Sequence, residues 1–223
     1  MRYYPVFLRV AGRRCLVIGA GAVAARKVES LINADAPVTV ISPELTAEIS
    51  ALASAGRITH HARCYQEGDL QGFFLAYAAT NDVAVHTRIA REAEAAGVLL
   101  NVVDAPALST FIVPSVVQRG DLLIATSTSG KSPALAKRIR QDLEHSFGPE
   151  YEVALRLLGR LRESFRQQCM PTEERQRIFG ALVDSALIDY LRHGQHAAVD
   201  RLLATTVGAG VSLATLGVDL THE

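Results

Sequence analysis

The sequence has no tryptophan, few cysteines and no excess of either charge. Its 223 residues include 23 Lys and Arg against 23 Asp and Glu. This balance argues against a general nucleic-acid-binding protein, because such proteins are usually basic overall. Cys15, Cys64 and Cys169 are odd in number and far apart, so they predict neither a disulfide framework nor a zinc site. We expect them to be small packing residues in a cytoplasmic protein.

Long hydrophobic runs are also missing. No apolar stretch approaches the length of a membrane span. Arg9, Arg13 and Arg14 interrupt the first apolar residues, so we expect no signal peptide. With 49% hydrophobic and 21% charged residues, the composition is that of an ordinary globular protein of one large or two small domains.

Short apolar runs alternate with helical patterns over the first hundred residues. Continuous apolar runs are typical of strands that are buried on both faces of a parallel sheet. We therefore expect an α/β fold, with a Rossmann-like parallel sheet and helices on both faces. The expected strands are residues 14–19, 38–42, 58–65, 73–80 and 99–104, and the expected helices are 22–33, one opening at Pro43-Glu44, and 82–96 with Gly97 as its stop.

The pattern changes after Pro106. Two β-rich runs, FIVPSVVQRG and LLIATSTSG, meet at residues 119–121 and predict a hairpin. Ser132-Pro133 predicts a helix start, with Leu135, Ile139 and Leu143 on one face of that helix. From residue 147 onward the pattern is helical, with a new start at 171–174 and a break at Gly194. We expect three parts: a dinucleotide-binding domain 1–113, a small β-α region 114–147 and a helical domain 148–223.

The segment 19–24 reads Gly-Ala-Gly-Ala-Val-Ala, a G-x-G-x-x-A motif between a predicted strand and a predicted helix. Gly19 permits a tight turn, and Gly21 lets the backbone approach a pyrophosphate. The residues that open the helix, Ala22 and Val23, would present their backbone amides to the phosphates. The motif alone is weak, but its position between strand and helix favours nucleotide binding over a simple turn.

The second strand should end near the ribose of the adenosine. Glu44, just past the strand end, could accept a hydrogen bond from the 2′-hydroxyl, or it could merely support a helix start. The backbone at Ser42 and Pro43 could serve the adenosine side instead. No Lys or Arg is near in the sequence, which favours NAD over NADP as cofactor.

Polar residues also follow the fourth and fifth strands, at the edge where α/β sheets bind ligands. Thr80 and Asn81 could contact the cofactor, or Asn81 and Asp82 could cap the next helix. Asp104, in NVVDAP, is a candidate proton acceptor, although Asp before a proline is often only a turn residue. We expect Asn101, from the same motif, to contact substrate.

The segment TSTSGKSPALAKRIR, residues 126–140, combines hydroxyls, a glycine and several cations. From residue 119 to 140 there are five basic residues and one acid, a local charge of +4. Such a segment suits a polyanionic small molecule, or it is a solvated helix face. The substrate candidates here are Ser127, Thr128, Gly130 and Lys131. SGKS lacks the spacing of a P-loop.

Taken together, YYPVFL, VIGAGAVAARK, AATND, NVVDAP, FIVPS and TSGKSPALA resemble the precorrin-2 dehydrogenase family over about residues 3–146. This family is the NAD-dependent module of siroheme synthesis, found alone or fused to a methyltransferase. The chain has too few residues after 150 for the methyltransferase, so we expect methylation by a separate enzyme.

The resemblance implies a homodimer with a central dimerisation region. It implies NAD⁺-dependent oxidation of the tetrapyrrole precorrin-2 to sirohydrochlorin, to which some members add Fe²⁺ insertion. The essential aspartate of the family falls on Asp104, the cofactor turn on 19–23, the adenosine contacts on Pro43 and Glu44, and the substrate pocket on 127–131. No resident metal ligands are implied; His60-His61 and His193 with His196 are weak candidates for a transient metal contact.

Three other functions are weighed against this one. A NAD-sensing module without catalysis would not need Asp104 or the basic segment. A short-chain alcohol dehydrogenase needs Tyr-x-x-x-Lys, and none of the six tyrosines has a lysine four residues later. A nucleic-acid protein using the helix 131–140 conflicts with the zero net charge.

Overall fold

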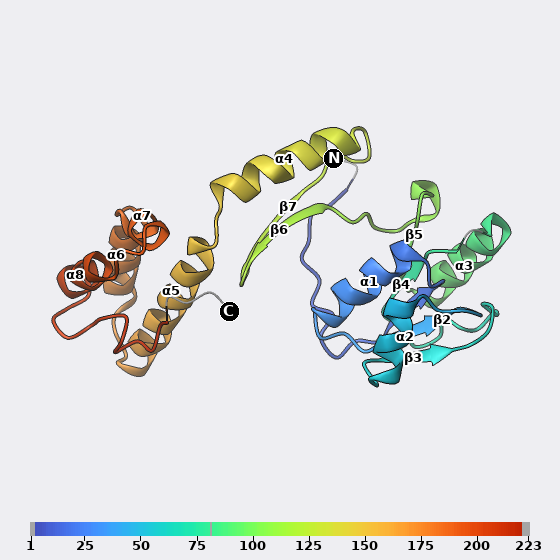
Figure 1. Ribbon diagram of the computed structural model, residues 1–223, viewed down its shortest axis with the longest axis horizontal. Coiled ribbons are helices and arrows are strands. Elements are labelled where there is room, and N and C mark those ends of the chain that lie inside the picture. The colour runs from blue at the N-terminus through green and yellow to red at the C-terminus, as the bar shows by residue number, and fades with distance from the viewer. Residues whose placement is uncertain (1–2, 81, 220–223) are drawn as a thin grey trace. The chain divides into compact units, whose positions relative to one another are not determined.

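The computed structural model describes residues 3–80 and 82–219, and the chain divides into two compact units, Met1–Val113 and Pro114–Glu223. The first unit contains a five-stranded parallel sheet in the order β3-β2-β1-β4-β5 (Figure 1). Its strands are β1 (Cys15–Ile18), β2 (Val38–Ile41), β3 (Ile58–His61), β4 (Leu75–Ala78) and β5 (Leu99–Val102), and its helices are α1 (Ala22–Ile32), α2 (Ala47–Ser54), α3 (Val83–Ala96) and the 3₁₀ turn η1 (Pro106–Leu108). This confirms the predicted Rossmann-like sheet.

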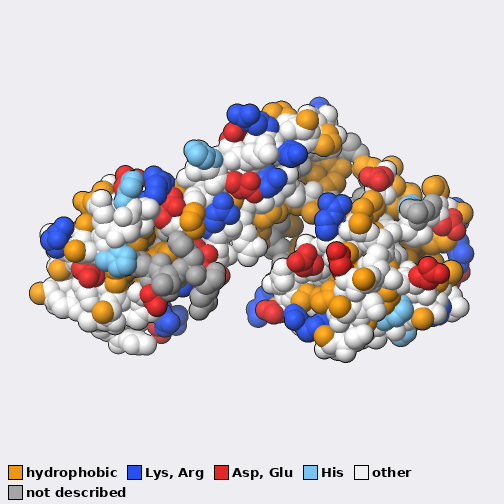
Figure 2. Space-filling model, in the orientation of Figure 1, with side chains coloured by type: hydrophobic (Ala, Val, Ile, Leu, Met, Phe, Trp, Pro, Cys, Tyr) orange, Lys and Arg blue, Asp and Glu red, His pale blue; other side chains and the backbone are white. Residues whose placement is uncertain are grey.

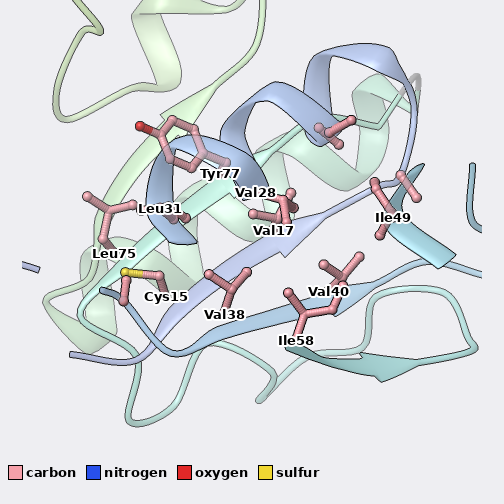
Figure 3. Close-up of a cluster of buried hydrophobic side chains, with 14 of the residues drawn as sticks. Cys15, Val17, Val28, Leu31, Val38, Val40, Ile49, Ile58, Leu75 and Tyr77 are labelled. Atoms are coloured by element: carbon pink, nitrogen blue, oxygen red, sulfur yellow. The ribbon is translucent and has the colours of Figure 1, made fainter. Parts of the chain in front are cut away.

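Both faces of the sheet are covered, which explains why its strands are apolar at consecutive positions. On one face Cys15 and Val17 pack with β2, β4, α1 and α2 (Figure 3). On the other face Leu16 and Ile18 pack with α3 and the segment before β4. The helix α1 can approach β1 closely because Ala24 is fully buried against it with only a methyl group.

Two helix boundaries follow from capping. The carboxylate of Asp82 accepts hydrogen bonds from the backbone amides of Ala84 and Val85 at the start of α3. Gly97 ends α3 in the left-handed conformation, at φ 66°, as predicted. The expected helix start at Pro43-Glu44 is wrong: the chain bends there, stays extended at Thr46 (ψ 159°), and enters α2 only at Ala47.

All five strands are shorter than the sequence predicts, and β3 and β5 show how a turn ends a strand early. β3 ends at His61, where the backbone amide of Arg63 turns back to the carbonyl oxygen of His61. β5 ends at Val102 because Asp104 has φ +59°, which turns the chain out of the sheet. The pattern of apolar and polar residues along the sequence does not reveal such turns, because each turn depends on the backbone angles of one or two residues.

The second unit begins with the predicted hairpin, β6 (Ser115–Arg119) and β7 (Leu122–Thr126), which pair antiparallel. α4 (Pro133–Ser146) packs on it, and the hydroxyl of Ser132 accepts from the amide of Leu135 as the predicted cap. Up to residue 219 four further helices follow: α5 (Glu150–Gln167), α6 (Thr172–Val183), α7 (Leu187–Arg192) and α8 (His196–Thr206). Gly194, at φ +63°, separates α7 from α8 as expected.

The helices α5 to α8 enclose an apolar core that includes Leu157, Leu161 and Leu203. At its margin the buried carboxylate of Glu150 accepts from Arg192 at 3.0 Å. The division of this unit into a region 114–147 and a helical domain 148–223 stays a prediction. No helix in the described part of the chain is long and apolar enough to cross a membrane.

Asp69 organises the loop between β3 and β4 that leads into the second core. Its carboxylate accepts two hydrogen bonds from the guanidinium of Arg63, at 2.7 and 2.6 Å, and one from the amide of Gln66 at 2.7 Å. Leu70, the next residue, is fully buried in that core. The hydrogen bonds from Arg63 hold the pKa of Asp69 below its ordinary value.

We therefore predict that Asp69→Asn lowers the free energy of unfolding at pH 7 by about 1 kcal/mol. Because the pKa of Asp69 is lower in the folded chain, its stabilisation is complete above the unfolded pKa and is lost as pH falls through the folded pKa. Urea unfolding should thus separate wild type from variant at pH 7, and the difference should disappear as the pH falls through the folded pKa of Asp69. Glu67→Gln, an exposed neighbour, is the control and should change little at either pH. If the difference in the free energy of unfolding between wild type and Asp69→Asn did not change with pH, the ionised carboxylate of Asp69 would not be the stabilising group.

Candidate functional site

The candidate site lies at the carboxyl ends of β1 and β4. These strands are neighbours in the sheet, yet β1 leads to α1 on one face and β4 leads to α3 on the other. The loops that follow β1 and β4 therefore run to opposite faces of the sheet. The crevice between two such loops is the place where α/β sheets bind ligands.

Gly19 is the residue that allows the two loops to meet. Its φ is +105°, and a Cβ atom at this position would lie 2.3 Å from the carbonyl oxygen of Ala79. The amide of Gly19 also donates to the carbonyl oxygen of Ile41, at 2.8 Å. The turn is thus attached to the strands on both sides of β1, and only glycine fits there.

Gly21 has a different role. It has φ −76°, which any residue can adopt, and a Cβ atom there would meet nothing within 4 Å. It is the N-cap of α1, where no side chain caps the helix and the first turn has no acidic residue. The open space and uncapped amides, including those at Ala22 and Val23, fit the pyrophosphate of a dinucleotide.

The end of β2 forms the adenosine side of the predicted site. Ser42 is buried; its amide donates to the carbonyl oxygen of His61 at 3.3 Å, and its carbonyl oxygen lies 2.9 Å from Nε2 of His60. Pro43 and Glu44 are exposed. Glu44 precedes the cap of α2 by two residues. Its contact with a ribose hydroxyl stays a prediction.

The loop after β4 has a similar support. The hydroxyl oxygen of Thr80 accepts from the amide of Asp82 at 3.2 Å, and the carbonyl oxygen of Thr80 lies 2.9 Å from Nε2 of the buried His86. Asp82 caps α3, as one of the two interpretations proposed. Asn81 lies outside the described residues. No sequence pattern marks the support that His60 and His86 provide, because neither belongs to a motif.

Asp104 is displayed on a tight turn. It is exposed and holds φ +59°, a conformation that Asp tolerates better than most residues. The hydroxyl of Ser109 fixes the turn, accepting from the amide of Val102 at 2.9 Å and lying 3.2 Å from the carbonyl oxygen of Ala105. Ser109 was not predicted, because its only signal in the sequence is a serine shortly after a turn.

Asn101, predicted to contact substrate, forms a hydrogen bond with another residue of the first unit. Its side-chain amide donates to the carbonyl oxygen of Phe111 at 3.0 Å, and Thr110 exchanges hydrogen bonds with Leu100 beside it. These bonds hold the segment 109–111 along the outer edge of β5. A role of Asn101 toward substrate stays a prediction.

The remaining candidates lie in the second unit, in the loop between β7 and α4. The hydroxyl of Thr128 accepts from the amide of Ser132 at 3.2 Å and lies 3.1 Å from its carbonyl oxygen. The hydroxyl of Ser127 accepts from the amide of Ser129. Gly130 has φ +79° and Lys131 is exposed. Hydrogen bonds between its own residues therefore fix the shape of this loop, and Lys131 is its exposed cation.

The positive charge of this segment is smaller than the sequence count indicated. Arg138 pairs with Asp142 and Arg140 pairs with Glu144, one helical turn further along α4. Figure 2 shows basic and acidic side chains interleaved over this helix. The count to residue 140 left out these acids, so Lys131 in the loop is a better candidate than the helix face.

His193 and His196, weighed as a pair for a transient metal contact, lie on different helices. Gly194 places His193 at the end of α7 and His196 at the start of α8, so the two do not share a helix. Within residues 3–80 and 82–219, no group of three or more His, Cys, Asp or Glu side chains is arranged to hold a metal ion.

Three family models match the chain in succession. Residues 6–115 match a NAD(P)-binding family, residues 119–146 the sirohaem biosynthesis protein central family, and residues 154–206 the sirohaem synthase dimerisation region.

Curated relatives support the same assignment. A siroheme synthase of Methylobacillus flagellatus is 41% identical over 179 residues, which are 80% of this chain and 38% of that protein. A siroheme synthase of Chromobacterium violaceum is 34% identical over 210 residues, 94% of this chain and 45% of that protein. The chain thus spans less than half the length of these relatives. Among solved structures, SirC, a precorrin-2 dehydrogenase, matches with a TM-score of 0.77 and 25% identity over 92% of this chain and 99% of that one.

The two glycines should respond differently to the same methyl group. Gly21→Ala places a Cβ in open space, so we expect an unchanged melting temperature and NAD binding at least about tenfold weaker, because the methyl group occupies the approach to the pyrophosphate. Gly19→Ala should lower the melting temperature itself, because its Cβ overlaps a backbone oxygen. Thermal unfolding and titration with NAD measure both effects. Unaltered NAD affinity in Gly21→Ala would exclude this turn as the pyrophosphate site.

Proposed function

This chain belongs to the siroheme synthase family, and on that premise we propose that it oxidises precorrin-2 to sirohydrochlorin with NAD⁺ as the hydride acceptor. The single observation that carries the proposal is the arrangement at one sheet edge. A turn that can accept a pyrophosphate at Gly21 and a displayed carboxylate at Asp104 both follow strands of the same parallel sheet.

The cofactor supplies the hydride chemistry when it is bound, and the chain supplies its placement. The open N-terminus of α1 binds the pyrophosphate. The carboxylate of Glu44 accepts from the ribose hydroxyl and repels a 2′-phosphate, which favours NAD over NADP. Ser42, Pro43 and Thr80 shape the loops on the two sides of the turn.

Asp104 takes the proton. Loss of a hydride from the substrate must be matched by loss of a proton, so that the products are sirohydrochlorin, NADH and H⁺. An exposed carboxylate can receive this proton and pass it to water. Its turn is held by Ser109, so the carboxylate is presented at a defined position rather than on a mobile loop.

Precorrin-2 carries eight carboxylates, so we expect at least one cationic side chain of the protein to pair with them. We assign this contact to Lys131, with Ser127, Thr128 and Gly130 in the same loop. Asn101, on β5 of the first unit, is a separate candidate for a substrate contact. The paired charges along α4 reduce the contribution of the helix, which leaves the loop as the recognition element.

We also propose a cytoplasmic homodimer. The hairpin is two-stranded, and one of its faces carries the exposed side chains of Val116 and Leu123. An isolated hairpin is marginally stable in water, so a second copy that covers this face would stabilise it. The match of residues 154–206 to a dimerisation region supports the same assembly.

The first experiment is an anaerobic assay of the purified chain with enzymatically made precorrin-2 and NAD⁺. We expect the absorption spectrum to change to that of sirohydrochlorin only when NAD⁺ is present. NAD⁺ binding without oxidation would favour the alternative, a non-catalytic NAD-sensing module. Adding Fe²⁺ afterwards tests the second activity of some family members: metal insertion faster than the protein-free rate would make this chain bifunctional.

Asp104→Asn removes the negative charge and keeps a residue that tolerates positive φ. We expect a folded protein with wild-type NAD affinity whose turnover falls at least about a hundredfold, as for loss of a general base. Asp35→Asn is the matched control, because Asp35 is also exposed with φ +57° but precedes β2 at the opposite end of the sheet. It should turn over at the wild-type rate. Equal rates in both variants would remove Asp104 from catalysis.

A further inference from the structure

Two histidines support the loops on either side of the glycine turn in the same way. β2 and β4 are the two neighbours of β1 in the sheet. Just past each of these strands, one backbone carbonyl oxygen lies 2.9 Å from a histidine Nε2: His60 reaches Ser42, and His86 reaches Thr80. A carbonyl can only accept, so in each pair the ring donates from Nε2.

Neither carbonyl belongs to the regular ladder of the sheet. On the β4 side the ladder reaches the carbonyl oxygen of Ala78, which accepts from the amide of Val103. The carbonyl of Thr80 lies two residues beyond it. On the β2 side the last strand residue, Ile41, already accepts from Gly19, and the carbonyl of Ser42 follows it. The histidines therefore hold loop carbonyls one or two residues past the strand ends, where the sheet no longer determines the backbone.

Both histidine–carbonyl hydrogen bonds are at least partly buried. His86 is 7% exposed on α3, although it is a polar residue, and Ser42 is 9% exposed. His60 is half-buried on β3, where it is in register with Val40 of β2. Hydrogen bonds shielded from water resist competition from solvent, so they can fix a loop before any ligand arrives.

We propose that His60 and His86 are positioning residues that hold the two loops flanking the glycine turn in the shape that binds the dinucleotide. The β4 loop in particular rests on Gly19, since its backbone at Ala79 is what a Cβ at Gly19 would strike. Loss of either histidine frees a loop carbonyl and lowers the fraction of molecules in the binding conformation, which weakens the apparent affinity by the same factor.

The two histidines act on different halves of the cofactor. A dinucleotide-binding sheet has two mononucleotide-binding halves, and the half that begins with β1 and β2 takes the adenosine. His60 thus acts on the adenosine side, and His86, beyond β4, acts on the nicotinamide side. This inference rests on the proposed function for the identity of the ligand.

The experiment compares the binding of NAD and of ADP, which carries only the adenosine half and its phosphates. His60→Leu should weaken both ligands by about twofold to tenfold, the effect of one lost hydrogen bond. His86→Leu should weaken NAD by a similar factor and leave ADP within about twofold. The double variant should lose NAD affinity by about the product of the two factors, because the sites lie on opposite sides of β1.

Two sets of variants separate positioning from general damage. Glutamine places an amide donor near the former Nε2, so His60→Gln and His86→Gln should recover most of the affinity. His61→Leu is the matched control, because His61 is the next residue on β3, exposed and on the opposite face from His60, and it should bind both ligands as wild type does. If a leucine variant does not fold, methionine at the same position replaces it in the comparison.

Turnover gives an independent readout. In the folded variants the KM for NAD should rise by the factor seen in binding, whereas kcat at saturating NAD should stay within about twofold. Folded leucine variants that bind NAD as tightly as wild type would overturn the inference, as would a His86 variant that loses ADP and NAD equally. Failure of the wild-type chain to bind NAD at all would instead refute the proposed function.

Discussion

The approach of two backbone segments at Gly19 is the constraint on which the site depends. β1 and β4 are adjacent, and the loops that leave them come so close that a single methyl group at Gly19 would overlap the carbonyl oxygen of Ala79. This contact brings the N-terminus of α1 to the sheet edge at which β4 and β5 also end. The uncapped amides at the start of α1, the loop at Thr80 and the carboxylate of Asp104 therefore all belong to one edge.

The site is supported mainly by side chains that do not enter it. His60 and His86 hold loop carbonyls, and Ser109 holds the turn that presents Asp104. Each supporting group is a hydrogen-bonding side chain on a rigid element or a short segment beside a strand. Such support keeps the ligand-contacting backbone in place without occupying the ligand's space, which is the requirement for preorganised binding.

The electrostatics of the second unit illustrate how local pairing alters a charge count. The five basic residues between 119 and 140 suggested a broad cationic face. Asp142 and Glu144, one turn further on, pair with two of them, so that the helix carries alternating charge. A polyanionic tetrapyrrole would then meet a small number of displayed cations, chief among them Lys131, rather than a uniform field. Such an arrangement favours orientation of the substrate over nonspecific attraction.

The sequence by itself determined the parallel sheet, the hairpin, the glycine turn, the stop at Gly97 and the cap at Ser132, because periodicity and capping are local properties. It also carried the family resemblance, which three successive family models and the fold of SirC support. Only the tertiary structure decided the shorter ends of β3 and β5, the late start of α2 and the support from His60 and His86. These features depend on single backbone angles and on contacts between residues distant in sequence, such as Ser42 and His60, which no local pattern records.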